Sequence, residues 1–381
     1  MFLKTKWVNF VAMMIAVLLF VVGCNFTGSD DANTEATNDD QDQTSEEQKN
    51  DGTSESDSNS DSKQVLNLVT TDELGSMDIL LEHGVLTPLA NTIEGLYSIG
   101  RDHQPVLTGA ESHEMSEDGL VHTFKIRDNV WSNGDPVTAH DYVYSWRRTF
   151  EEIGYYNYSF ADAKILNAQE IMDGEKSPEE LGIEALDDKT LQITLAEPYP
   201  NLKLSLAFPA FGPVNQKFVE SVGDEYGQAH DKVLYNGPFM LSAWNQSQGW
   251  TYQKNPHYWD ADNIKLEEVN VSIVKEESTA VNLYESGEID LVEISSAFID
   301  RYQDDPNYST EPTAQIRFLR FNHTHDVLKN KNIRRALDYG WDKAPLTDVI
   351  LKNGSIPTYY LVPDVPLPSG ESFRSVNGDF T

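Results

Sequence analysis

Residues 131–141 read WSNGDPVTAHD. The Asn-Gly and Asp-Pro pairs of this stretch predict a turn, because glycine and proline adopt the backbone angles that turns require. Thr138 and Asp141 have the three-residue spacing of a capping box, which predicts that a helix begins at this point. Apolar side chains then recur at helical spacing from Val143 to Phe150, so we expect this helix to bury one face in a core.

Alternating and helical patterns on both sides of this stretch predict further elements. Alternation predicts strands at residues 65–69, 122–126, 191–195, 269–274, 289–292 and 316–322, with a turn and strand inside 234–244. Helical spacing predicts helices at residues 87–97, 278–286 and 332–339. Because strands and helices mix without a strict βαβ repeat, the pattern favours an α/β fold with mixed sheets.

The N-terminus has the three parts of an export signal. Lys4 and Lys6 precede an almost wholly apolar run at residues 8–22, and Gly23-Cys24 then leads into polar sequence. The run is short for a membrane span, which needs about 20 apolar residues. The small residue before Cys24 resembles a bacterial lipobox, so we expect residues 1–24 to be a lipoprotein signal peptide with Cys24 lipidated. The alternative is an uncleaved anchor helix.

The composition of the chain argues against some classes of binding partner. Sixty-two acidic residues against 28 basic ones leave a net charge of −34, and such a field repels nucleic acid and anionic lipid headgroups. We therefore expect no nucleic-acid partner, and contact with the membrane only through the lipid anchor. Residues 25–64 are almost entirely polar and acidic, which predicts a disordered tether. Since Cys24 is the only cysteine, neither an internal disulfide nor a thiolate metal site is expected.

Motifs for catalysis or metal binding are absent from the sequence. It contains no G-x-x-x-x-G-K-[ST], H-E-x-x-H or G-x-S-x-G pattern. His323 and His325 are the nearest approach to metal-ligand spacing, and solvated loop histidines explain them better. We therefore predict no catalytic residue, no metal and no cofactor.

The stretch at 131–141 is one of a series of ordered blocks. The others are SEDG (116–119), TFKIR (123–127), YSW (144–146), ALDDKTL (185–191), NGPF (236–239), KNPHYW (254–259), YESGEID (284–290), IRRAL (333–337) and GSIP (354–357). Together they resemble the family 5 extracellular solute-binding proteins, which are the oligopeptide- and dipeptide-binding receptors of ABC importers. The resemblance extends over residues 65–363.

The resemblance implies an architecture like that of type II periplasmic binding proteins, a clam-shell with mixed sheets. Residues 65–99 and 184–352 would form a discontinuous lobe I, and residues 100–183 an inserted domain II. Residues 353–381 would begin lobe III. Family members continue for roughly another lobe, so we expect this chain to be truncated at its C-terminus, with most of lobe III missing.

The resemblance also implies a function. The chain would capture peptides of a few residues at the outer face of a bacterial, Gram-positive cell membrane and deliver them to ABC importer permease subunits, without catalysis. The alternative is a truncated, non-transporting paralogue that docks on the permease or senses peptides. A surface peptidase is a third possibility that no motif supports.

The residues that the resemblance assigns to peptide binding come from three parts of the chain. They are Glu82, Gly84 and Val85 after the first strand, Tyr156 in an aromatic cluster, and Asn322 and Tyr359 further on. A glycine in the loop would let a ligand backbone approach closely, and receptors of this kind bind peptides through strand-like backbone hydrogen bonds. An ordinary loop and a core-packing Tyr156 are the alternatives.

Overall fold

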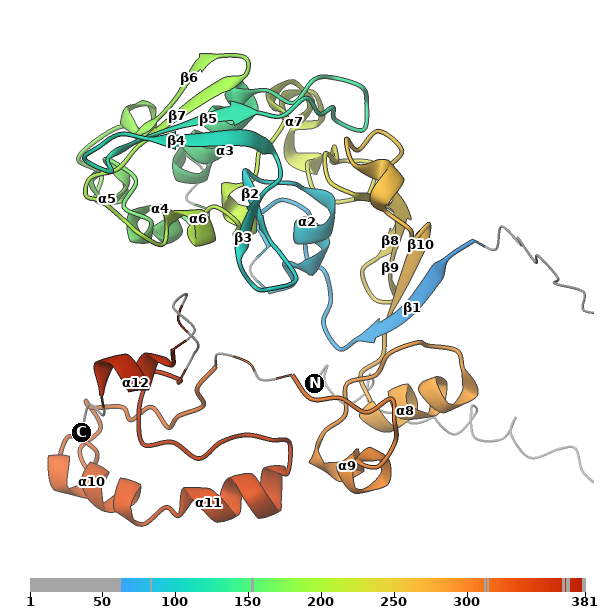
Figure 1. The fold of residues 1–381 in the computed structure, drawn as a ribbon, viewed down its shortest axis with the longest axis vertical. Helices are drawn as coiled ribbons and strands as arrows, with labels where there is room; N and C mark the ends of the chain where they lie inside the picture. The colour runs from blue at the N-terminus through green and yellow to red at the C-terminus, as the bar shows by residue number, and fades with distance from the viewer. Residues whose placement is uncertain are drawn as a thin grey trace, which may run out of the picture. The chain divides into compact units, whose positions relative to one another are not determined.

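The computed structural model describes residues 63–378, except residues 83, 152–153, 312, 314, 365–366 and 368–370. The predicted signal peptide with Cys24, and residues 25–62 of the predicted tether, lie outside the described residues. The described part contains three β-sheets with helices around them (Figure 1). None of its helices is long and apolar enough to cross a membrane.

The first sheet holds β1 (Val65–Thr70), β10 (Glu268–Ile273), β9 (Gly249–Lys254) and β8 (Phe239–Asn245), in the order β1-β10-β9-β8. β1 pairs with β10 in parallel, and the other pairs are antiparallel. Alternate residues of these strands, including Leu241, Tyr252 and Val271, are buried in one apolar cluster. Helix α2 (Thr87–Thr92) packs against β8.

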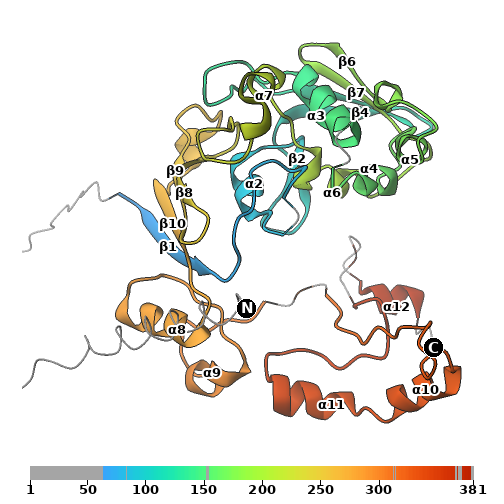
Figure 2. The same cartoon turned by 180° about the vertical axis from the view of Figure 1, so that it is seen from behind.

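The second sheet is antiparallel throughout. It holds β4 (Ala110–Met115), β5 (Val121–Ile126), β7 (Thr190–Thr194) and β6 (Ile183–Asp187), in the order β4-β5-β7-β6. Helix α3 (Ala139–Glu151) packs against β6 and β7, and it lies behind the sheet in Figure 1 and in front of it in Figure 2. A separate hairpin pairs β2 (Tyr97–Ile99) with β3 (Pro105–Leu107).

Helix α3 begins as the sequence predicts. The Asp141 Oδ2 atom accepts the Thr138 backbone N–H at 2.8 Å and the Thr138 hydroxyl at 3.0 Å. The indole N–H of Trp131 donates to the same carboxylate oxygen at 3.4 Å. The turn before the helix and the first turn of the helix are thus joined by one acidic side chain. Trp146, further along α3, is completely buried.

Short helical segments complete the described part. They are α4 (Tyr158–Asp162), α5 (Ala168–Met172), η1 (Pro178–Glu180), α6 (Leu202–Ser205), η2 (Pro209–Phe211), α7 (Gln216–Val222), η3 (Gly223–Glu225), η4 (Ala261–Asn263), α8 (Glu277–Ser286), α9 (Ser296–Tyr302), α10 (Lys331–Tyr339), α11 (Lys343–Pro345), η5 (Leu346–Leu351) and α12 (Phe373–Asn377). The predicted helices at 278–286 and 332–339 are confirmed as α8 and α10.

Three predicted elements differ in the structure. The helix predicted over 87–97 ends at Thr92, because the Asn236 side chain bonds both the N–H and the C=O of Glu94. Residues 289–292 are not a strand. The Asp290 N–H donates to Asn67 O at 2.9 Å, as in a strand, but the Asp290 side chain accepts the Asn67 N–H at 2.7 Å in place of its backbone carbonyl, so the pairing does not continue. Residues 316–322 are also not a strand, since no strand among the described residues pairs with them.

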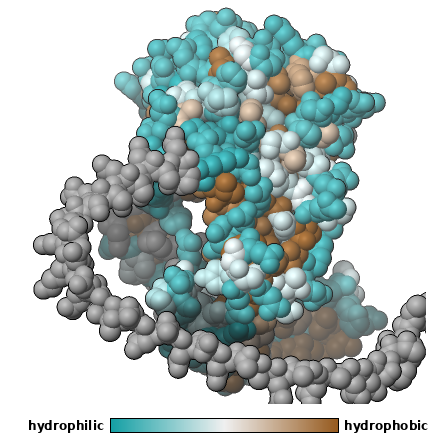
Figure 3. Space-filling view, turned by 90° about the vertical axis from the view of Figure 1, so that its right-hand side faces the viewer, coloured by the Kyte–Doolittle hydropathy of each residue, from teal (hydrophilic) through white to brown (hydrophobic). Residues whose placement is uncertain are grey.

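The surface mixes hydrophilic and hydrophobic side chains. Figure 3 shows brown hydrophobic residues between teal hydrophilic ones on one face of the molecule. Large apolar side chains are exposed at several positions between residues 318 and 362, including Phe318, Leu319, Ile350 and Ile356. Single exposed apolar residues are normal in soluble proteins, whereas a run of them along one segment is less usual.

Candidate functional site

The loop that follows β1 is organised around one buried glutamate. Residues 75–82 with 84 and 85 form what we call the clasp loop. Glu82 is only 4% exposed, and its Oε2 atom accepts the backbone N–H groups of Gly75 at 2.8 Å and Ser76 at 3.1 Å. Its Oε1 atom accepts those of Gly84 at 2.6 Å and Val85 at 2.9 Å. One carboxylate therefore joins the two ends of the loop.

The charge state of Glu82 follows from these contacts. Burial acts to raise the pKa of Glu82, because a charged carboxylate loses its hydration. The four backbone N–H donors favour the charged form and together hold the pKa below its ordinary value. Glu82 is therefore an anion at neutral pH, and both of its oxygens are occupied by the loop itself.

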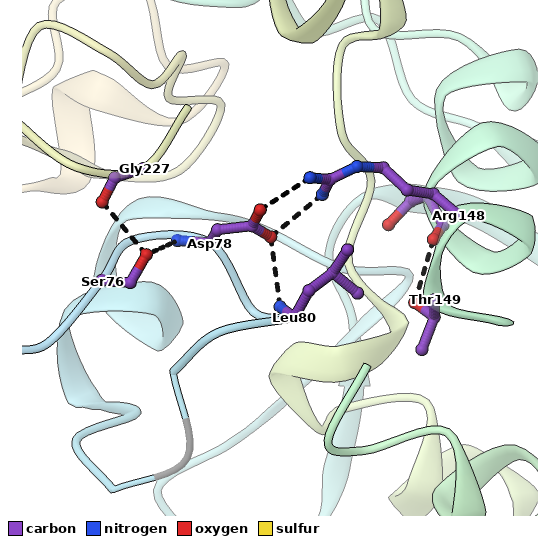
Figure 4. Close-up of polar contacts among 7 residues, drawn as sticks. Ser76, Asp78, Leu80, Arg148, Thr149 and Gly227 are labelled. Carbon is purple, nitrogen blue, oxygen red and sulfur yellow. Dashed lines mark hydrogen bonds and ion pairs between the residues drawn. The ribbon is translucent and has the colours of Figure 1, made fainter. Parts of the chain in front are cut away.

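A second acidic side chain ties the clasp loop to helix α3. Asp78 faces Arg148 in a two-pronged ion pair, with N–O distances of 3.0 and 2.7 Å (Figure 4). The Asp78 Oδ1 atom also accepts the Leu80 backbone N–H at 3.1 Å. Burial lowers the pKa of Arg148, but the hydrogen bonds and charge of Asp78 outweigh this effect and raise it. The guanidinium lies 5.3 Å from the ring centroid of Tyr226.

The clasp loop is also hydrogen-bonded to the turn that contains Gly227. Gly227 O accepts the Met77 N–H at 2.8 Å and the Ser76 hydroxyl at 3.1 Å, and the Ser76 Oγ atom in turn accepts the Asp78 N–H at 2.9 Å (Figure 4). Gly227 has a positive φ of 73°, and a Cβ atom there would lie 2.4 Å from the Asp78 backbone nitrogen. Only glycine fits this close approach of two backbones.

An aromatic turn lies against the clasp loop. The Tyr155 N–H donates to Leu80 O at 3.5 Å, and Tyr156 is buried in the same apolar cluster as Leu80 and Val85. The Tyr156 ring contacts Tyr155 edge-on, with centroids 4.9 Å apart. Burial raises the pKa of Tyr156, and the neighbouring Tyr158, Tyr155 and Glu82 add to the effect. Tyr155 and Tyr158 keep 56% and 45% of their surface exposed.

The structure brings four of the six predicted site residues together. Glu82, Gly84 and Val85 lie on the clasp loop, and Tyr156 packs beside it. Asn322 is exposed, and its side chain accepts the N–H and hydroxyl of Thr324. Tyr359 is 76% exposed, with the Lys343 Nζ atom 4.0 Å from its ring centroid. Among the described residues, neither Asn322 nor Tyr359 bonds or stacks with the clasp loop or Tyr156.

Sequence reasoning missed the residues that support this loop. Asp78, Arg148 and Gly227 were not among the predicted site residues, although Asp78 lies within the clasp loop and Arg148 and Gly227 both bond to it. Asp78 and Arg148 are 70 positions apart, so no local pattern links them. A positive-φ glycine likewise has no signal in a single sequence unless its turn partner is known.

At Gly84 and Val85, the clasp loop has unpaired hydrogen-bond acceptors but no unpaired donors among the described residues. The N–H groups of Gly84 and Val85 are taken by Glu82. Their carbonyl oxygens accept no hydrogen bond from any described residue. Gly84 is exposed and Val85 is half-buried. Within the described ranges, no group of three or more His, Cys, Asp or Glu residues is arranged to hold a metal ion.

Comparison with known proteins gives consistent matches. The model of the bacterial extracellular solute-binding proteins, family 5 Middle, matches residues 104–379. The chain is 33% identical to the dipeptide-binding protein DppE of Bacillus subtilis over 77% of this chain. It covers 54% of the length of that curated relative, or about half.

Solved structures match as well. The peptide-bound structure of Listeria monocytogenes OppA superposes with a TM-score of 0.75 at 39% identity, covering 83% of this chain and 65% of that one. Haemophilus influenzae OppA in complex with the peptide RPPGFSPFR superposes with a TM-score of 0.70 at 30% identity, covering 80% of this chain and 61% of that one.

Proposed function

Because this chain belongs to the bacterial extracellular solute-binding proteins of family 5, we propose that it binds oligopeptides and delivers them to the permease of an ABC importer. The predicted family is confirmed, as is the predicted α/β fold with mixed sheets. Peptide binding is named for relatives that are longer than this chain, so for this chain both peptide binding and delivery to an importer are proposals. The proposed function involves no catalysis.

One observation carries the proposal beyond the family. Glu82 and Asp78 hold the clasp loop through hydrogen bonds and an ion pair, and the exposed Tyr155 bonds the loop at Leu80 O, so that backbone carbonyls and a tyrosine ring are available in the same part of the chain. Backbone carbonyls recognise what all peptides share, and tyrosine offers a broad face to varied side chains. A loop that is fixed by its own hydrogen bonds suits a receptor for peptides of many sequences, because little ordering of the loop is needed on binding.

The remaining predicted site residues belong to this proposal as well. We place Gly84, Val85 and Tyr156 at the peptide backbone. Asn322 and Tyr359, which have no contact with the clasp loop among the described residues, would meet the ligand from other segments. Glu82 would act through the loop that it holds.

The proposal includes a lobe assignment that the strand pairing refines. Residues 65–99 and 184–352 would form lobe I, residues 100–183 the inserted domain, and residues 353–381 the start of lobe III. The boundary at residue 183 falls at the first residue of β6. Because β6 and β7 pair with β5, we extend the inserted domain to Thr194 so that its sheet stays whole.

The proposal also places the chain at the outer face of the cell membrane, held there by a lipid on Cys24. Growth with a clickable palmitate analogue, followed by fractionation, tests this placement. The wild-type chain should be labelled and sediment with membranes, whereas Cys24→Ser should be unlabelled. Labelling of the Cys24→Ser variant would contradict the anchor.

Peptide binding is tested directly by calorimetry. The purified chain from Asn25 onward is titrated with tri-, tetra- and pentapeptides, and co-purified ligands are sought by native mass spectrometry. Binding of several unrelated peptides is expected. Tyr156→Phe should weaken it, while Tyr339→Phe, which removes the hydroxyl of an 82% exposed tyrosine, should not. Absence of binding to every peptide length would contradict the function for this chain.

A further inference from the structure

Two histidines face each other across strands β4 and β5 of the second sheet. We propose that His113 and His122, together with Met115, form a binding site for a copper ion. The inference is independent of peptide binding, because the site shares no residue with the clasp loop. It adds a second binding site, for a ligand of a different chemical class.

The two imidazole rings meet nitrogen to nitrogen. His113 Nε2 lies 2.8 Å from His122 Nδ1, and the ring centroids are 5.1 Å apart. Two nitrogen lone pairs repel at this distance, so a proton or a metal ion must lie between them. Two nitrogens that ligate one metal ion at about 2.0 Å and at a right angle are about 2.8 Å apart. The spacing therefore suits the square-planar coordination of copper(II) as well as it suits a shared proton.

The outer nitrogen of each ring already has a partner that can accept a hydrogen bond. The Tyr97 hydroxyl lies 2.9 Å from His113 Nδ1, and Gly119 O lies 3.3 Å from His122 Nε2. Each neutral ring can therefore keep its single proton on the outer nitrogen, which leaves both facing nitrogens free to bind a metal ion without release of a proton. Ligand histidines usually donate their other N–H to an acceptor in this way.

A thioether lies on the same face of the sheet. Met115 is directly opposite His122 in the pairing of β4 with β5, and directly opposite side chains project to one face. A Cβ atom at Gly119 would lie 4.0 Å from Met115 Sδ, so the sulfur is next to the residue whose carbonyl contacts His122. Met115 is 62% exposed, which gives an ion a path from solvent, and thioether sulfur favours copper(I).

Nearby charges act on this site in both directions. The positive charge of Lys203 acts on both rings, and it opposes the binding of a cation. The net charge of −34 on the whole chain attracts cations to its surface. Within the described part of the chain, no carboxylate bonds either ring, so no acidic neighbour holds His113 or His122 as a cation. Both rings are therefore available as neutral ligands.

The sequence predicted no metal site, because its most closely spaced candidates are His323 and His325. His113 and His122 are nine positions apart, and only the pairing of β4 with β5 brings their rings together. Since His323 and His325 are both exposed, they provide a matched control pair for a metal-binding experiment.

Copper binding is measured on the full chain in mild detergent, made without a histidine tag. All proteins carry Cys24→Ser, which removes the only thiol. Copper sulfate is titrated by calorimetry, and electron paramagnetic resonance of bound copper(II) counts its nitrogen ligands. Copper(I) affinity is measured with ascorbate and a chromogenic chelator as competitor. Far-UV circular dichroism and the melting temperature, with and without copper, follow the fold.

The variants test each part of the site separately. His113→Asn should remove the two-nitrogen signal. Tyr97→Phe should weaken copper(II) binding by about 10–100-fold, the loss typical of an outer partner of a ligand histidine. Met115→Leu should weaken copper(I) binding more than copper(II) binding, and Lys203→Gln should tighten both. Copper should raise the melting temperature of the parent chain but not that of His113→Asn.

The double variant His323→Asn with His325→Asn should bind copper as the parent chain does. Loss of binding in this control, with binding kept in His113→Asn, would assign the ion to the exposed pair and overturn the inference. A spectrum with fewer than two nitrogens would also overturn it. No binding to the parent chain would show that His113 and His122 share only a proton. If His113→Asn does not fold, unchanged affinity in both Tyr97→Phe and Met115→Leu would overturn the inference.

Discussion

Arg148 and Asp78 form a two-pronged ion pair, with N–O distances of 3.0 and 2.7 Å and side chains only 12% and 3% exposed. Arg148 belongs to helix α3, which packs on the second sheet, and Asp78 belongs to the loop that leaves β1 of the first sheet. A buried arginine–carboxylate fork has strict geometry. This pair therefore ties the clasp loop to a rigid helix.

The first prediction concerns that ion pair. Asp78→Asn should lower the free energy of unfolding by about 3–5 kcal/mol, because it leaves the Arg148 charge buried without a partner. The double variant Asp78→Leu with Arg148→Met should recover much of the loss, since it removes both charges. Urea unfolding followed by tryptophan fluorescence measures each value.

Its control is an ion pair at the surface. Glu197→Gln breaks the exposed contact between Glu197 and Lys164, and exposed pairs contribute little to stability. This variant should unfold as the wild type does. A loss in Asp78→Asn no larger than in Glu197→Gln would show that the buried pair is not a structural tie.

The second prediction compares two glycines with nearly the same backbone angle. Gly227 and Gly174 have φ values of 73° and 76°, but a Cβ atom at Gly227 would lie 2.4 Å from the Asp78 nitrogen, whereas nothing lies within 4 Å at Gly174. Gly174→Ala should cost about 1–2 kcal/mol, the penalty of a left-handed residue. Gly227→Ala should cost about 1–3 kcal/mol more, because backbone atoms must move. Equal losses of stability in the two variants would mean that the clasp loop moves away from the new Cβ atom at residue 227 at no cost.

The third prediction concerns a buried carboxyl outside the site. Glu94 accepts hydrogen bonds from the Tyr258 hydroxyl and from Trp259 Nε1, the latter at 2.8 Å. The Arg127 guanidinium lies 4.0 Å from the Trp259 ring centroid. Burial raises the pKa of Glu94 from 4.5 to about 7, although these donors and Arg127 oppose the shift.

The sign of the pH effect follows from that shift. The folded state holds the Glu94 proton more tightly than the unfolded chain does, so its contribution to stability is complete below pH 4.5 and is lost as the pH rises to about 7. The loss is on the order of 3 kcal/mol. Glu94→Gln, which mimics the neutral acid, should flatten this part of the stability–pH curve, and the exposed Glu184→Gln should not. An unchanged slope in Glu94→Gln would contradict the assignment.

The fourth prediction concerns a chain of histidines on the second sheet. The Tyr97 hydroxyl lies 2.9 Å from His113 Nδ1, and His113 Nε2 lies 2.8 Å from His122 Nδ1. Burial, together with the charges of His122 and Lys203, lowers the pKa of His113 from 6.5 to about 4. Burial lowers the pKa of His122 as well.

Acid should therefore weaken this sheet. In the unfolded chain His113 is protonated below about pH 6.5, whereas in the folded chain it is protonated only below about pH 4. The free energy of unfolding therefore falls as the pH drops from 6.5 to about 4. His113→Asn should reduce that fall, while His257→Asn, at an exposed position, should leave it unchanged. The effect opposes that of Glu94, so the two variants should tilt the curve in opposite directions. A steeper fall in His113→Asn would contradict the prediction.

Local sequence patterns predicted much of the fold. The Thr138–Asp141 cap, the start of α3 and most strands depend on residues within a few positions of each other, and such patterns act before the chain folds. The failures have a tertiary cause. Residues 87–97 were predicted to be one helix, yet Asn236, far along the chain, takes the backbone groups of Glu94. At the expected strand 289–292, Asp290 makes one backbone bond to Asn67 of β1, but its side chain takes the Asn67 N–H that a strand carbonyl would accept.

In the candidate site, too, some features could be predicted from the sequence and others depend on contacts between distant residues. The sequence, through its ordered motifs, determined the family and pointed to six site residues. Four of them, Glu82, Gly84, Val85 and Tyr156, lie together in the structure, while Asn322 and Tyr359 neither bond nor stack with them among the described residues. The inward direction of Glu82, toward four backbone amides, and the meeting of Arg148 with Asp78 across 70 positions become visible only in the folded chain. The physical reason is that hydrogen bonds and ion pairs depend on distance and direction in space. A single sequence specifies those only between near neighbours, and chain folding sets them for all the rest.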